Sequence, residues 1–472
     1  MNPKLLLEED EMRALGYRVI DMIVNHTANI NDKSVTNQKT REDLESMLRE
    51  PIPQTGMSPH ILLDHIEKDV LSNIMHLDHN RFFAFVPIPS NYVGALADFL
   101  SVGFNIMCCT WMESSAAGQI ELVTIKWLTD LFKLPDNAGG LFVSGGSMGN
   151  LMGVLLAIRH RKQKGKISTI YFSDQTHSSV HNAIKILSNE EVKFREIPTD
   201  QAFKINVEQL HTTIQQDKNA GFHPIGIVAN CGTTNTGTVD DLSAMAVICQ
   251  KENLWYHIDA AYGGAGILDE RQAHLFEGTE LADSMTVDPH KWWFQPNETA
   301  CLLVRDTSKL LDIFYMMPEY LKDMDRKNGE VNFGNYGLQL TRSFRAFKLW
   351  MSLKIFGLDS FTQGVKHGID LAEFAAKEVK KYKNWTVVIP PQLAIINFQF
   401  QPPNLDLEQT NLLNKAIIDG IVASGFAMIS STKLKEQLVV RLCIINPRTT
   451  EEDIKETIRR LNQIAIQQTA NF

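Results

Sequence analysis

The chain has 472 residues, 44% of them hydrophobic and 21% charged, and acidic residues outnumber basic ones 55 to 46 for a net charge of −9. This composition is typical of a globular protein and excludes a mostly disordered chain. At roughly 100–200 residues per domain, the length leaves room for two to four domains. A nucleic acid is not expected as a partner, because binding it needs a positive stripe, whereas the basic residues gather only at 159–166.

The six cysteines contain no CxxC pattern and are too few for a disulfide framework. They predict buried thiols in a reducing compartment and exclude a cysteine zinc site. The first residues lack the pattern of a secretory signal peptide. The most apolar stretch, 92–112, contains Asp98 and Asn105, so it predicts a buried helix plus connector, open to a subunit contact, rather than a membrane span. We therefore expect a cytoplasmic protein with no membrane partner.

Residues 1–75 predict a helical arm. Apolar residues recur at helical spacing between positions 5 and 23 and again between 61 and 75. Prolines at 51, 53 and 59 mark an extended linker between these stretches. Helices of this kind cannot bury their apolar faces alone, so the arm must dock on the main body or on another subunit.

The middle of the chain alternates short apolar runs with amphipathic helices. The expected strands are 141–144, 169–172, 192–197, 225–229, 255–258, 284–287 and 300–304, and the expected helices are 148–161, 178–187, 207–216 and 240–251. This alternation indicates βαβ units and a mainly parallel sheet whose strands are buried on both faces.

The C-terminal part has a different pattern. A long helix is expected from about 341 to 382, followed by extended segments at 386–400 and 438–445. Helices at about 408–423 and 450–467 flank the second extended segment. This pattern predicts a smaller α+β domain.

Ligands bind at the carboxyl ends of the strands in an open parallel sheet, and a glycine-rich segment, 144–149 (SGGSMG), lies at one such end. It opens a helix, where free N–H groups and the helix dipole favour an anion, most often phosphate. The segment lacks the GK[ST] of a nucleotide P-loop and the GxGxxG of a dinucleotide site. A tight glycine turn capped by Ser explains it equally well.

His177 and His181 follow the next expected strand and, four residues apart, would share one face of a helix. A metal site is not expected, because the HExxH pattern is missing and no third ligand is obvious nearby. Asp174 or Ser178 as helix caps would explain part of this cluster without any function.

Two more strand ends carry charged residues. Asp259 follows the strand 255–258 and could hold a protonated ring nitrogen of a cofactor, or simply end a turn. Lys291 lies 32 residues further on, next to His290 and two tryptophans. Partial burial there would lower the pKa of its amine and make it nucleophilic. The alternative is a surface lysine whose stem packs on the protein.

A phosphate-cradling turn, a histidine that can stack on a ring, an aspartate for a ring nitrogen and a lysine for a Schiff base are together the parts of a pyridoxal-phosphate site. The chain resembles the group II pyridoxal-phosphate-dependent decarboxylases, most closely the aromatic-L-amino-acid decarboxylase branch. The motifs that carry the resemblance are 173–179 (SDQTHSS), 232–234 (GTT), 257–264 (HIDAAYGG) and 288–292 (DPHKW), with weaker support from 342–345 (RSFR) and 446–450 (NPRTT). The likeness covers nearly the whole chain.

The resemblance implies a fold-type I α/β protein with a mainly parallel seven-stranded sheet in its large domain. The implied divisions are an N-terminal helical arm at 1–75, a large cofactor domain at 76–345 and a small α+β C-terminal domain at 346–472. A homodimer with shared active sites is also implied, and it fits the apolar faces of the arm.

The resemblance assigns the cofactor contacts residue by residue. Lys291 forms the Schiff base with the aldehyde of pyridoxal 5'-phosphate, Asp259 keeps the pyridine nitrogen protonated, and His177 stacks on the ring. The other implied contacts are Gly146, Ser147 and Met148 at the phosphate, Thr234 near the ring hydroxyl or the substrate carboxylate, Ala261 on the second ring face, Asp288 near the phosphate, and His290 at the phosphate or the substrate.

By the same resemblance, the segment 82–89 contacts the substrate through residues that include Phe85, Pro87 and Ile88, with His290 nearby. Its aromatic residues suit an aromatic substrate, and they suit an ordinary core strand equally well. Amine-forming relatives carry a small polar residue where this chain has Ile88. This difference predicts a different recognition of the substrate carboxylate.

A lid is expected from about Lys322 to Leu338. Amine-forming relatives carry a Tyr there that protonates the substrate carbon after decarboxylation, and an ungapped count from 342–345 places Phe333 at that position. A phenyl ring donates no proton, and in some plant relatives this change accompanies aldehyde synthesis. If the count is displaced, Tyr336 is the proton donor. Both readings stay open.

The resemblance thus predicts a pyridoxal-phosphate-dependent carboxy-lyase that converts an L-amino acid, with aromatic ones the best match, to the amine and CO2. The alternative product is an aldehyde, formed by decarboxylation coupled to oxidative deamination. An aminotransferase is a rival, with Arg448 as its carboxylate ligand, but the His177 motif favours a decarboxylase. A non-catalytic binding protein would tolerate the loss of Lys291, which is present.

Overall fold

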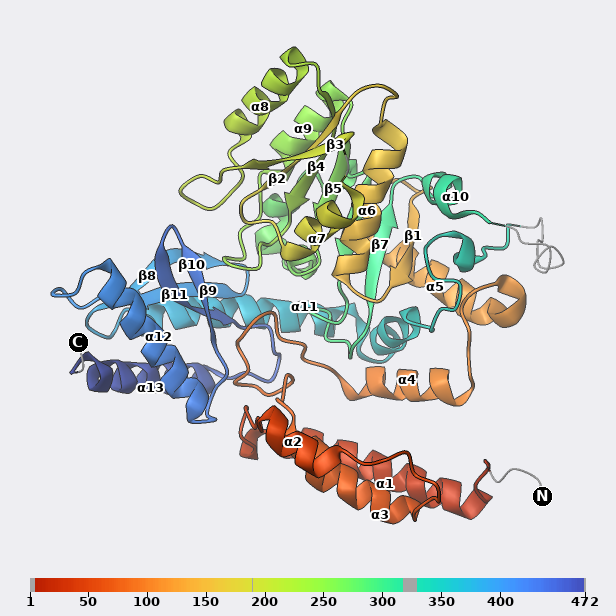
Figure 1. Ribbon diagram of the computed structural model, residues 1–472, viewed down its shortest axis with the longest axis vertical. Helices are drawn as coiled ribbons and strands as arrows, with labels where there is room; N and C mark the ends of the chain where they lie inside the picture. Colours follow the sequence, from red (N-terminus) through yellow and green to blue (C-terminus); the bar gives the residue numbers. More distant parts are fainter. Residues whose placement is uncertain (1–4, 189, 317–328, 471–472) are drawn as a thin grey trace.

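A computed structural model describes residues 5–188, 190–316 and 329–470 of the chain. Within these ranges the strands form a seven-stranded and a four-stranded sheet. The long helix α11 (Ala346–Val379) packs against helices beside the large sheet and against strands of the small one. Figure 1 shows the N-terminal helices as a separate layer on one side of the molecule.

The large sheet has the strand order β1-β7-β6-β5-β4-β2-β3. Its strands are β1 (Gly139–Val143), β2 (Ser168–Ser173), β3 (Val192–Ile197), β4 (His223–Asn230), β5 (Trp255–Asp259), β6 (Ser284–Val287) and β7 (Ala300–Val304). Only β7 pairs antiparallel, with β1 and β6. The prediction of a mainly parallel seven-stranded sheet is therefore confirmed.

The helices between these strands begin and end close to where the sequence predicts them. They are α6 (Gly146–Arg161), α7 (Ser178–Leu187), α8 (Val207–Asn219) and α9 (Leu242–Glu252), with α10 (Ser308–Phe314) after the last strand. Glycines let α6 approach the sheet closely, since a Cβ at Gly149 would lie 2.7 Å from Thr286 and one at Gly153 would lie 2.3 Å from the His257 ring.

The helix α5 (Trp111–Leu131) is not predicted by the sequence pattern. Its buried face includes Gly118, Glu121 and Thr124, so it lacks the apolar stripe by which an amphipathic helix is found. The buried Glu121 is neutralised by Arg342, whose Nη2 lies 2.6 Å from Glu121 Oε1. The charge of Glu121 is therefore compensated in the core by a residue more than two hundred positions later in the sequence.

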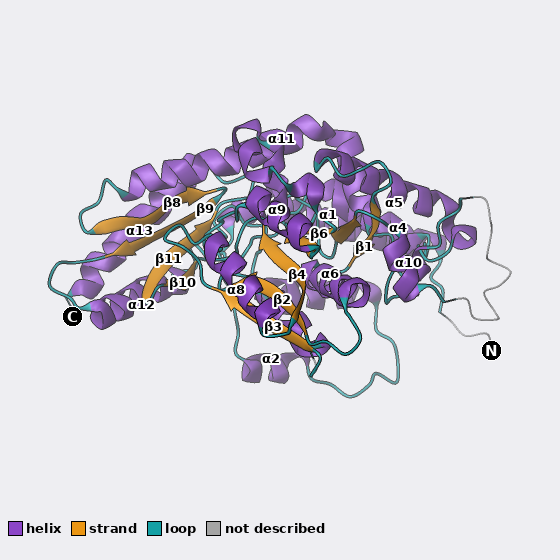
Figure 2. Ribbon diagram, turned by 90° about the horizontal axis from the view of Figure 1, so that it is seen from above, coloured by secondary structure: helices purple, strands orange, loops and turns teal. Residues whose placement is uncertain are grey.

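The small sheet has the antiparallel order β10-β11-β9-β8. Its strands are β8 (Trp385–Gln392), β9 (Ile395–Phe400), β10 (Ser430–Leu434) and β11 (Gln437–Cys443). The expected single extended segment 386–400 is a hairpin, in which Leu393 takes a positive φ of 51°. The sequence pattern misses β10 because its residues are mostly polar. With α11, the helices α12 (Leu407–Ala423) and α13 (Glu451–Thr469) pack around this sheet (Figure 2).

The N-terminal helices are α1 (Glu9–Ala28), α2 (Arg41–Leu48) and α3 (Pro59–His65). A five-residue π-turn, Ile66–Val70, replaces the continuous helix expected through residue 75. None of these three helices has a buried residue, although α1 carries Met12, Tyr17 and Ile23 among its exposed side chains. Within this one chain, the arm thus leaves its apolar face uncovered.

The helix α4 (Tyr92–Gly103) differs from the sequence expectation of a buried helix. It buries Gly94, Ala97 and Ser101, but Phe99 is 61% exposed and Val102 is 78% exposed. Only one face therefore packs against the protein, and the apolar run extends to the surface. Among the described residues no helix is both long and apolar enough to cross a membrane.

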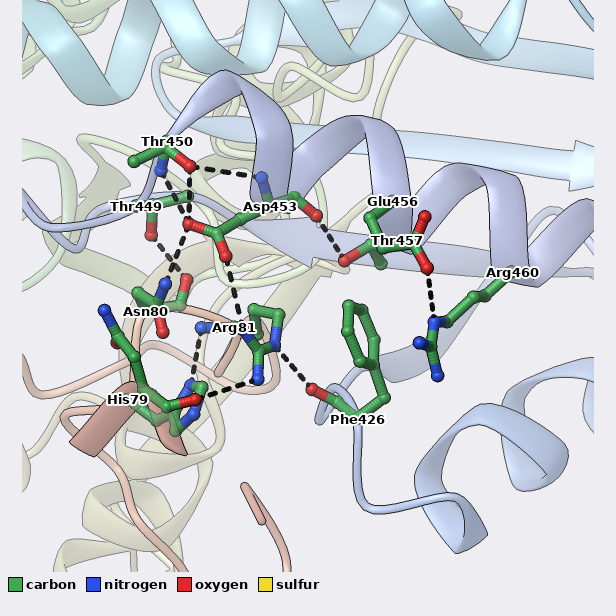
Figure 3. A network of polar contacts seen from close by, with 11 residues as sticks. His79, Asn80, Arg81, Phe426, Thr449, Thr450, Asp453, Glu456, Thr457 and Arg460 are labelled. Carbon is green, nitrogen blue, oxygen red and sulfur yellow. Dashed lines mark hydrogen bonds and ion pairs between the residues drawn. The ribbon is translucent and has the colours of Figure 1, made fainter. Parts of the chain in front are cut away.

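The segment that leaves the arm is tied to the C-terminal part of the chain (Figure 3). Arg81 Nε donates to the Phe426 carbonyl at 2.9 Å, and its guanidinium lies over the Phe426 ring, 4.4 Å from the centroid. Asn80 Nδ2 donates to Asp453 Oδ2 at 2.8 Å, and Thr449 Oγ1 donates to the Asn80 carbonyl at 2.6 Å. These contacts fix the position at which the chain enters the main body.

Candidate active site

A cavity of about 330 Å³ opens where strands of the large sheet end, within the size range of small-molecule sites, about 300–1,000 Å³. Each contributing strand passes directly into lining residues: β1 into Ser144, β2 into the loop that carries His177, and β6 into Asp288. The full lining is Ser144, Gly145, Gly146, Ser147, Asn150, His177, Ser179, Asn230, Gly232, Thr233, Thr234, Asp259, Ala261, Tyr262, Asp288, His290, Lys291, Asn297 and Glu298.

Most of the residues expected at the cofactor lie together in this lining. They are Gly146, Ser147, His177, Thr234, Asp259, Ala261, Asp288, His290 and Lys291. The expected residues that are not part of it are Met148, Phe85, Pro87, Ile88, Phe333 and Tyr336. The cavity therefore assembles the cofactor candidates but not the candidates for the substrate side chain and the lid.

Lys291 faces two carboxylates in the cavity. Its Nζ lies 2.8 Å from Oδ2 of Asp288, a side chain that is only 2% exposed. The lowered pKa that the sequence predicts for Lys291 is wrong. Burial does lower this pKa, but the attraction of Asp288, their hydrogen bond and the charge of Asp259 together raise it above its usual value. Asp288 Oδ1 has no hydrogen-bond partner among the described residues. A buried acceptor without a partner indicates that a further polar group belongs here.

Asp259 is buried at the end of β5 with both carboxylate oxygens held. Asn150 Nδ2 donates to Oδ2 at 2.7 Å, and the Ala261 N–H donates to Oδ1 at 3.1 Å. Neither donor is charged, so the carboxylate keeps its negative charge available. A buried anion of this kind raises the pKa of a nearby ring nitrogen and keeps that nitrogen protonated.

His177 begins α7 as its N-cap residue. Its Nδ1 accepts from the Ser179 N–H at 3.2 Å and lies 2.8 Å from Ser179 Oγ. Burial lowers the pKa of His177 more than the charge of Asp259 raises it. The imidazole is therefore neutral near pH 7 and can lie against a planar ring without adding a positive charge.

The start of α6 forms the anion-binding end of the cavity. The N–H groups of Met148 and Gly149 both donate to the Gly145 carbonyl, whereas the first amides of a helix have no partner within it. A Cβ at Gly146 would lie 2.7 Å from an Asp288 oxygen and 3.1 Å from the Ala261 Cβ, so glycine is required there. Ser147 and the helix dipole complete a site that suits phosphate.

His290 and Thr234 are held by their neighbours. His290 Nδ1 donates to the Thr299 carbonyl at 2.6 Å, and burial lowers the pKa of this imidazole. The Thr234 carbonyl accepts from Arg441 Nε at 2.8 Å. Because Arg441 also donates to the Phe85 carbonyl, this arginine joins the cavity wall to the segment expected at the substrate.

The lid candidates lie elsewhere. Phe333 is 1% exposed, with its ring under the Arg342 guanidinium, 5.0 Å from the carbon, and edge-on to Tyr336 at 5.7 Å. Burial raises the pKa of Tyr336. Of the segment expected as a lid, 322–328 lies outside the described residues. Phe85 is 58% exposed, and Pro87 and Ile88 follow it outside the lining.

Sequence reasoning missed several lining residues. Asn150 lies one turn after Gly146, so helical spacing could have found it. Ser179 lies two residues after His177 in a motif that the sequence already marks. Tyr262 stacks on Trp292 with ring centroids 5.4 Å apart, and Glu298 pairs with Arg345 at 2.9 Å. Tyr262 lies inside the motif 257–264 that the sequence already marks, whereas Glu298 carries no sequence signal.

The donor set matches one cofactor. A lysine amine, a buried aspartate, a neutral histidine and a helix N-terminus surround a single cavity, and these groups fit the aldehyde, ring nitrogen, ring face and phosphate of pyridoxal phosphate. Among the described residues, no group of three or more His, Cys, Asp or Glu side chains could hold a metal ion. The fold and the site define a pyridoxal-phosphate-dependent enzyme.

The chain belongs to the family described as the pyridoxal-dependent decarboxylase conserved domain, which matches residues 42–401, and within it to the aromatic-L-amino-acid decarboxylase branch. It is 44% identical to an aromatic-L-amino-acid decarboxylase of Bacillus atrophaeus over 98% of both chains. It is 28% identical to a phenylacetaldehyde synthase of Arabidopsis thaliana, covering 97% of this chain and 96% of that one. The protein is therefore a pyridoxal-phosphate-dependent carboxy-lyase that acts on an amino acid.

The fold agrees with solved structures. An Oryza sativa TDC crystallised with PLP and tryptamine matches over 99% of both chains with a TM-score of 0.92 at 23% identity. A Catharanthus roseus tryptophan decarboxylase in complex with L-tryptophan matches over 98% of this chain and 99% of that one, with a TM-score of 0.90 at 25% identity. The fold-type I assignment is thereby confirmed.

Proposed function

We propose that this enzyme decarboxylates an aromatic L-amino acid to its amine and CO2. The observation that carries the proposal is the meeting of Lys291, Asp259 and His177 in one cavity. The near full-length likeness to an aromatic-L-amino-acid decarboxylase supports the aromatic substrate class. When bound, pyridoxal phosphate supplies an electron sink that accepts the electron pair of the breaking bond to the carboxylate.

The residues of the chain have separate tasks in this proposal. Lys291 Nζ would hold the cofactor through its aldehyde until the amino group of the substrate takes that place. Asp259 would hold the proton on the ring nitrogen, and His177 would cover one ring face while Ala261 would pack on the other. Gly146, Ser147 and the free amides at the start of α6 would hold the phosphate, and Asp288 keeps Lys291 in place. The Met148 N–H, also expected at the phosphate, already donates to the Gly145 carbonyl.

The remaining assigned residues bind the substrate and its carboxylate. His290 lines the cavity with Nδ1 donating to the Thr299 carbonyl. Its Nε2, which lies 3.8 Å from Asp288 Oδ2, is the atom we assign to phosphate or substrate. Thr234 belongs to the cavity lining. Phe85, Pro87 and Ile88, which lie outside that lining, are the residues we assign to the substrate side chain. The carboxylate must lie in an apolar setting, because leaving water favours the loss of its charge as CO2.

The product depends on how the substrate carbon is protonated. Amine formation takes up one proton, and Tyr336 is the proposed donor. If Phe333 occupies the donor position, the carbon reacts instead with O2, and amino acid, O2 and water give aldehyde, CO2, ammonia and hydrogen peroxide. A likeness to a phenylacetaldehyde synthase supports this second route.

The deciding experiment is a product screen of the purified enzyme under air with each of the twenty amino acids, assaying CO2, amine, aldehyde and peroxide together. We expect CO2 and amine in equal amounts from an aromatic substrate, with no peroxide and little change in Phe333→Tyr. Peroxide in step with CO2 would establish the aldehyde route. A keto acid formed from pyruvate or 2-oxoglutarate would establish an aminotransferase. Lys291→Ala must abolish both turnover and the borohydride-reducible chromophore.

We further propose that the enzyme is a cytoplasmic homodimer with shared active sites, built from an arm at 1–75, a large domain at 76–345 and a small domain at 346–472. The uncovered apolar side chains of α1 and α4 support the dimer, since they need a second surface to bury them. Light scattering on the intact protein should give twice the mass of one chain. A monomeric mass at micromolar concentration would contradict the dimer.

A further inference from the structure

A continuous chain of hydrogen bonds runs through the sheet behind the cavity and reaches His177. Trp255 Nε1 donates to Ser284 Oγ at 2.9 Å, and Ser284 Oγ lies 2.8 Å from His257 Nδ1. His257 Nε2 lies 3.1 Å from Asn150 Oδ1. Asn150 Nδ2 then donates to both Asp259 Oδ2 and Ser179 Oγ, at 2.7 and 2.8 Å. These residues are all buried.

The two ends of this chain fix its direction. The indole N–H of Trp255 can only donate, and the ionised carboxylate of Asp259 can only accept. Asn150 must therefore turn its NH2 group toward Asp259 and its oxygen toward His257. That oxygen needs a donor, so His257 carries its proton on Nε2.

The middle of the chain is consistent with this direction. Complete burial lowers the pKa of His257 to about 4, so this imidazole is neutral and has one N–H. Its Nδ1 is then an acceptor of the hydrogen bond that the Ser284 hydroxyl donates. The Ser284 oxygen in turn accepts from Trp255 Nε1. Each donor and acceptor in the sequence Trp255, Ser284, His257 and Asn150 is satisfied once.

The direction continues into the active site. Asn150 uses its second N–H on Ser179 Oγ, so the Ser179 hydroxyl is free to donate its own proton to His177 Nδ1. The Ser179 backbone N–H points at the same nitrogen. His177 Nδ1 is therefore an acceptor, and a neutral His177 carries its proton on Nε2, on the side of the ring away from α7.

We propose that Asn150 is a positioning residue that couples the two cofactor-facing groups. It holds Asp259 with one amide proton and, through Ser179 Oγ, reinforces with the other the Nε2–H tautomer that the Ser179 backbone N–H also favours at His177. This assignment rests on the proposed function, because it describes how His177 presents its Nε2–H group to the reacting substrate. The packing is built for this contact: Gly153 leaves room for the His257 ring, which would lie 2.3 Å from a Cβ there.

The direct test is ¹⁵N NMR of the histidine side chains in the holoenzyme, with His177→Gln to identify the His177 signals. In the wild-type protein we expect a protonated Nε2 and an unprotonated Nδ1 at His177. In Asn150→Leu, which has a similar volume but no polar group, we expect a larger share of the Nδ1–H tautomer at His177, because only the Ser179 backbone N–H is then fixed as a donor to Nδ1. We also expect kcat to fall about 10-fold to 100-fold, the loss typical of a hydrogen bond to a charged group, while KM changes less.

Asn414 supplies the matched control. It is as buried as Asn150 and makes three hydrogen bonds, but these lie within the small sheet and α12. Asn414→Leu should lower stability and leave the His177 signals and kcat unchanged. If Asn150→Leu does not fold, Ser179→Ala removes only the hydroxyl link and keeps the backbone N–H that donates to His177 Nδ1. It too should raise the share of the Nδ1–H tautomer at His177.

The outcomes separate this proposal from the proposed function. An Nδ1–H tautomer in the wild-type protein, or an unchanged His177 spectrum in Asn150→Leu and Ser179→Ala, would overturn the role of Asn150 even if the enzyme decarboxylates aromatic amino acids. A larger share of the Nδ1–H tautomer at His177 in these variants supports the role of Asn150 even if the product screen finds a different substrate.

Discussion

At the scale of single residues, the site is a balance of buried charges. The cation of the site is Lys291, whose Nζ lies 2.8 Å from Asp288 Oδ2. The negative charge of Asp259 also raises the pKa of this lysine. The two carboxylates have different environments, because Asp259 is held by neutral donors whereas Asp288 is held by the lysine itself. Asp288 is therefore the group that keeps the lysine amine protonated, and Asp259 remains free to act on a ring nitrogen.

This balance predicts the effect of Asp288→Asn. Without that carboxylate, burial dominates and the pKa of Lys291 falls below its value in the wild-type protein. The unprotonated amine reacts with an aldehyde, so trapping of saturating pyridoxal phosphate on Lys291 with borohydride should begin at lower pH. Asp174→Asn, outside the cavity, is the control. A midpoint at the same or higher pH would contradict the assignment.

At the scale of elements, α6 presents glycines to the sheet, and this close approach brings Asn150 beneath the cavity. Gly153→Ala places a methyl group against the His257 ring, and overpacking of this kind costs about 1–3 kcal/mol. We expect a lower urea midpoint. Gly118→Ala in α5 is the matched control, because a Cβ there meets Trp111 at an ordinary 3.4 Å. Equal midpoints for the two variants would show that α6 can shift freely.

The ion pair of Glu121 and Arg342 joins α5 to the segment that follows β7, between α10 and α11. Glu121 also accepts the Phe142 N–H at 2.8 Å, and Arg342 donates to the Cys108 carbonyl at 2.7 Å. Arg342→Met should cost about 3–5 kcal/mol, since it leaves a buried carboxylate without its cation. Adding Glu121→Gln, which keeps the acceptor for Phe142, should restore part of this loss in urea denaturation. A double variant no more stable than Arg342→Met would contradict this account.

At the scale of the whole molecule, buried histidines tie stability to pH. His79 lies at the junction of Figure 3, and burial, reinforced by the charge of Arg81, lowers its pKa to about 4. An unfolded histidine takes up its proton near pH 6.5. Between these values the unfolded chain binds a proton that the folded chain does not, so the free energy of unfolding falls as the pH falls.

This linkage predicts a loss of up to about 1.4 kcal/mol for each pH unit and each such histidine below about pH 6.5. The urea midpoint of the wild-type protein should drop between about pH 7.5 and about pH 5, and the drop should be smaller in His79→Gln. The exposed His274 serves as the control, with His274→Gln keeping the wild-type slope. An equal slope in His79→Gln would show that His79 titrates normally in the folded protein.

Local pattern was sufficient for much of the fold and of the cofactor site. Short apolar runs located the strands of the large sheet, because parallel strands are buried on both faces and need no partner to be recognised. The motifs around His177, Asp259 and Lys291 each follow such a strand, and parallel strands end at one edge of a sheet. The sequence alone thus determined that these side chains converge, and which cofactor they suit.

Tertiary structure decided what depends on a distant partner. The buried face of α5 contains Glu121. This carboxylate is stable there only because it pairs with Arg342, which lies more than two hundred residues later in the sequence. The polar β10 becomes a strand because β11 pairs with it, and the role of Asn150 exists only where α6 crosses β5. Hydrophobic periodicity is a property of neighbouring residues, whereas charge compensation and hydrogen-bond direction are properties of pairs that only folding brings together.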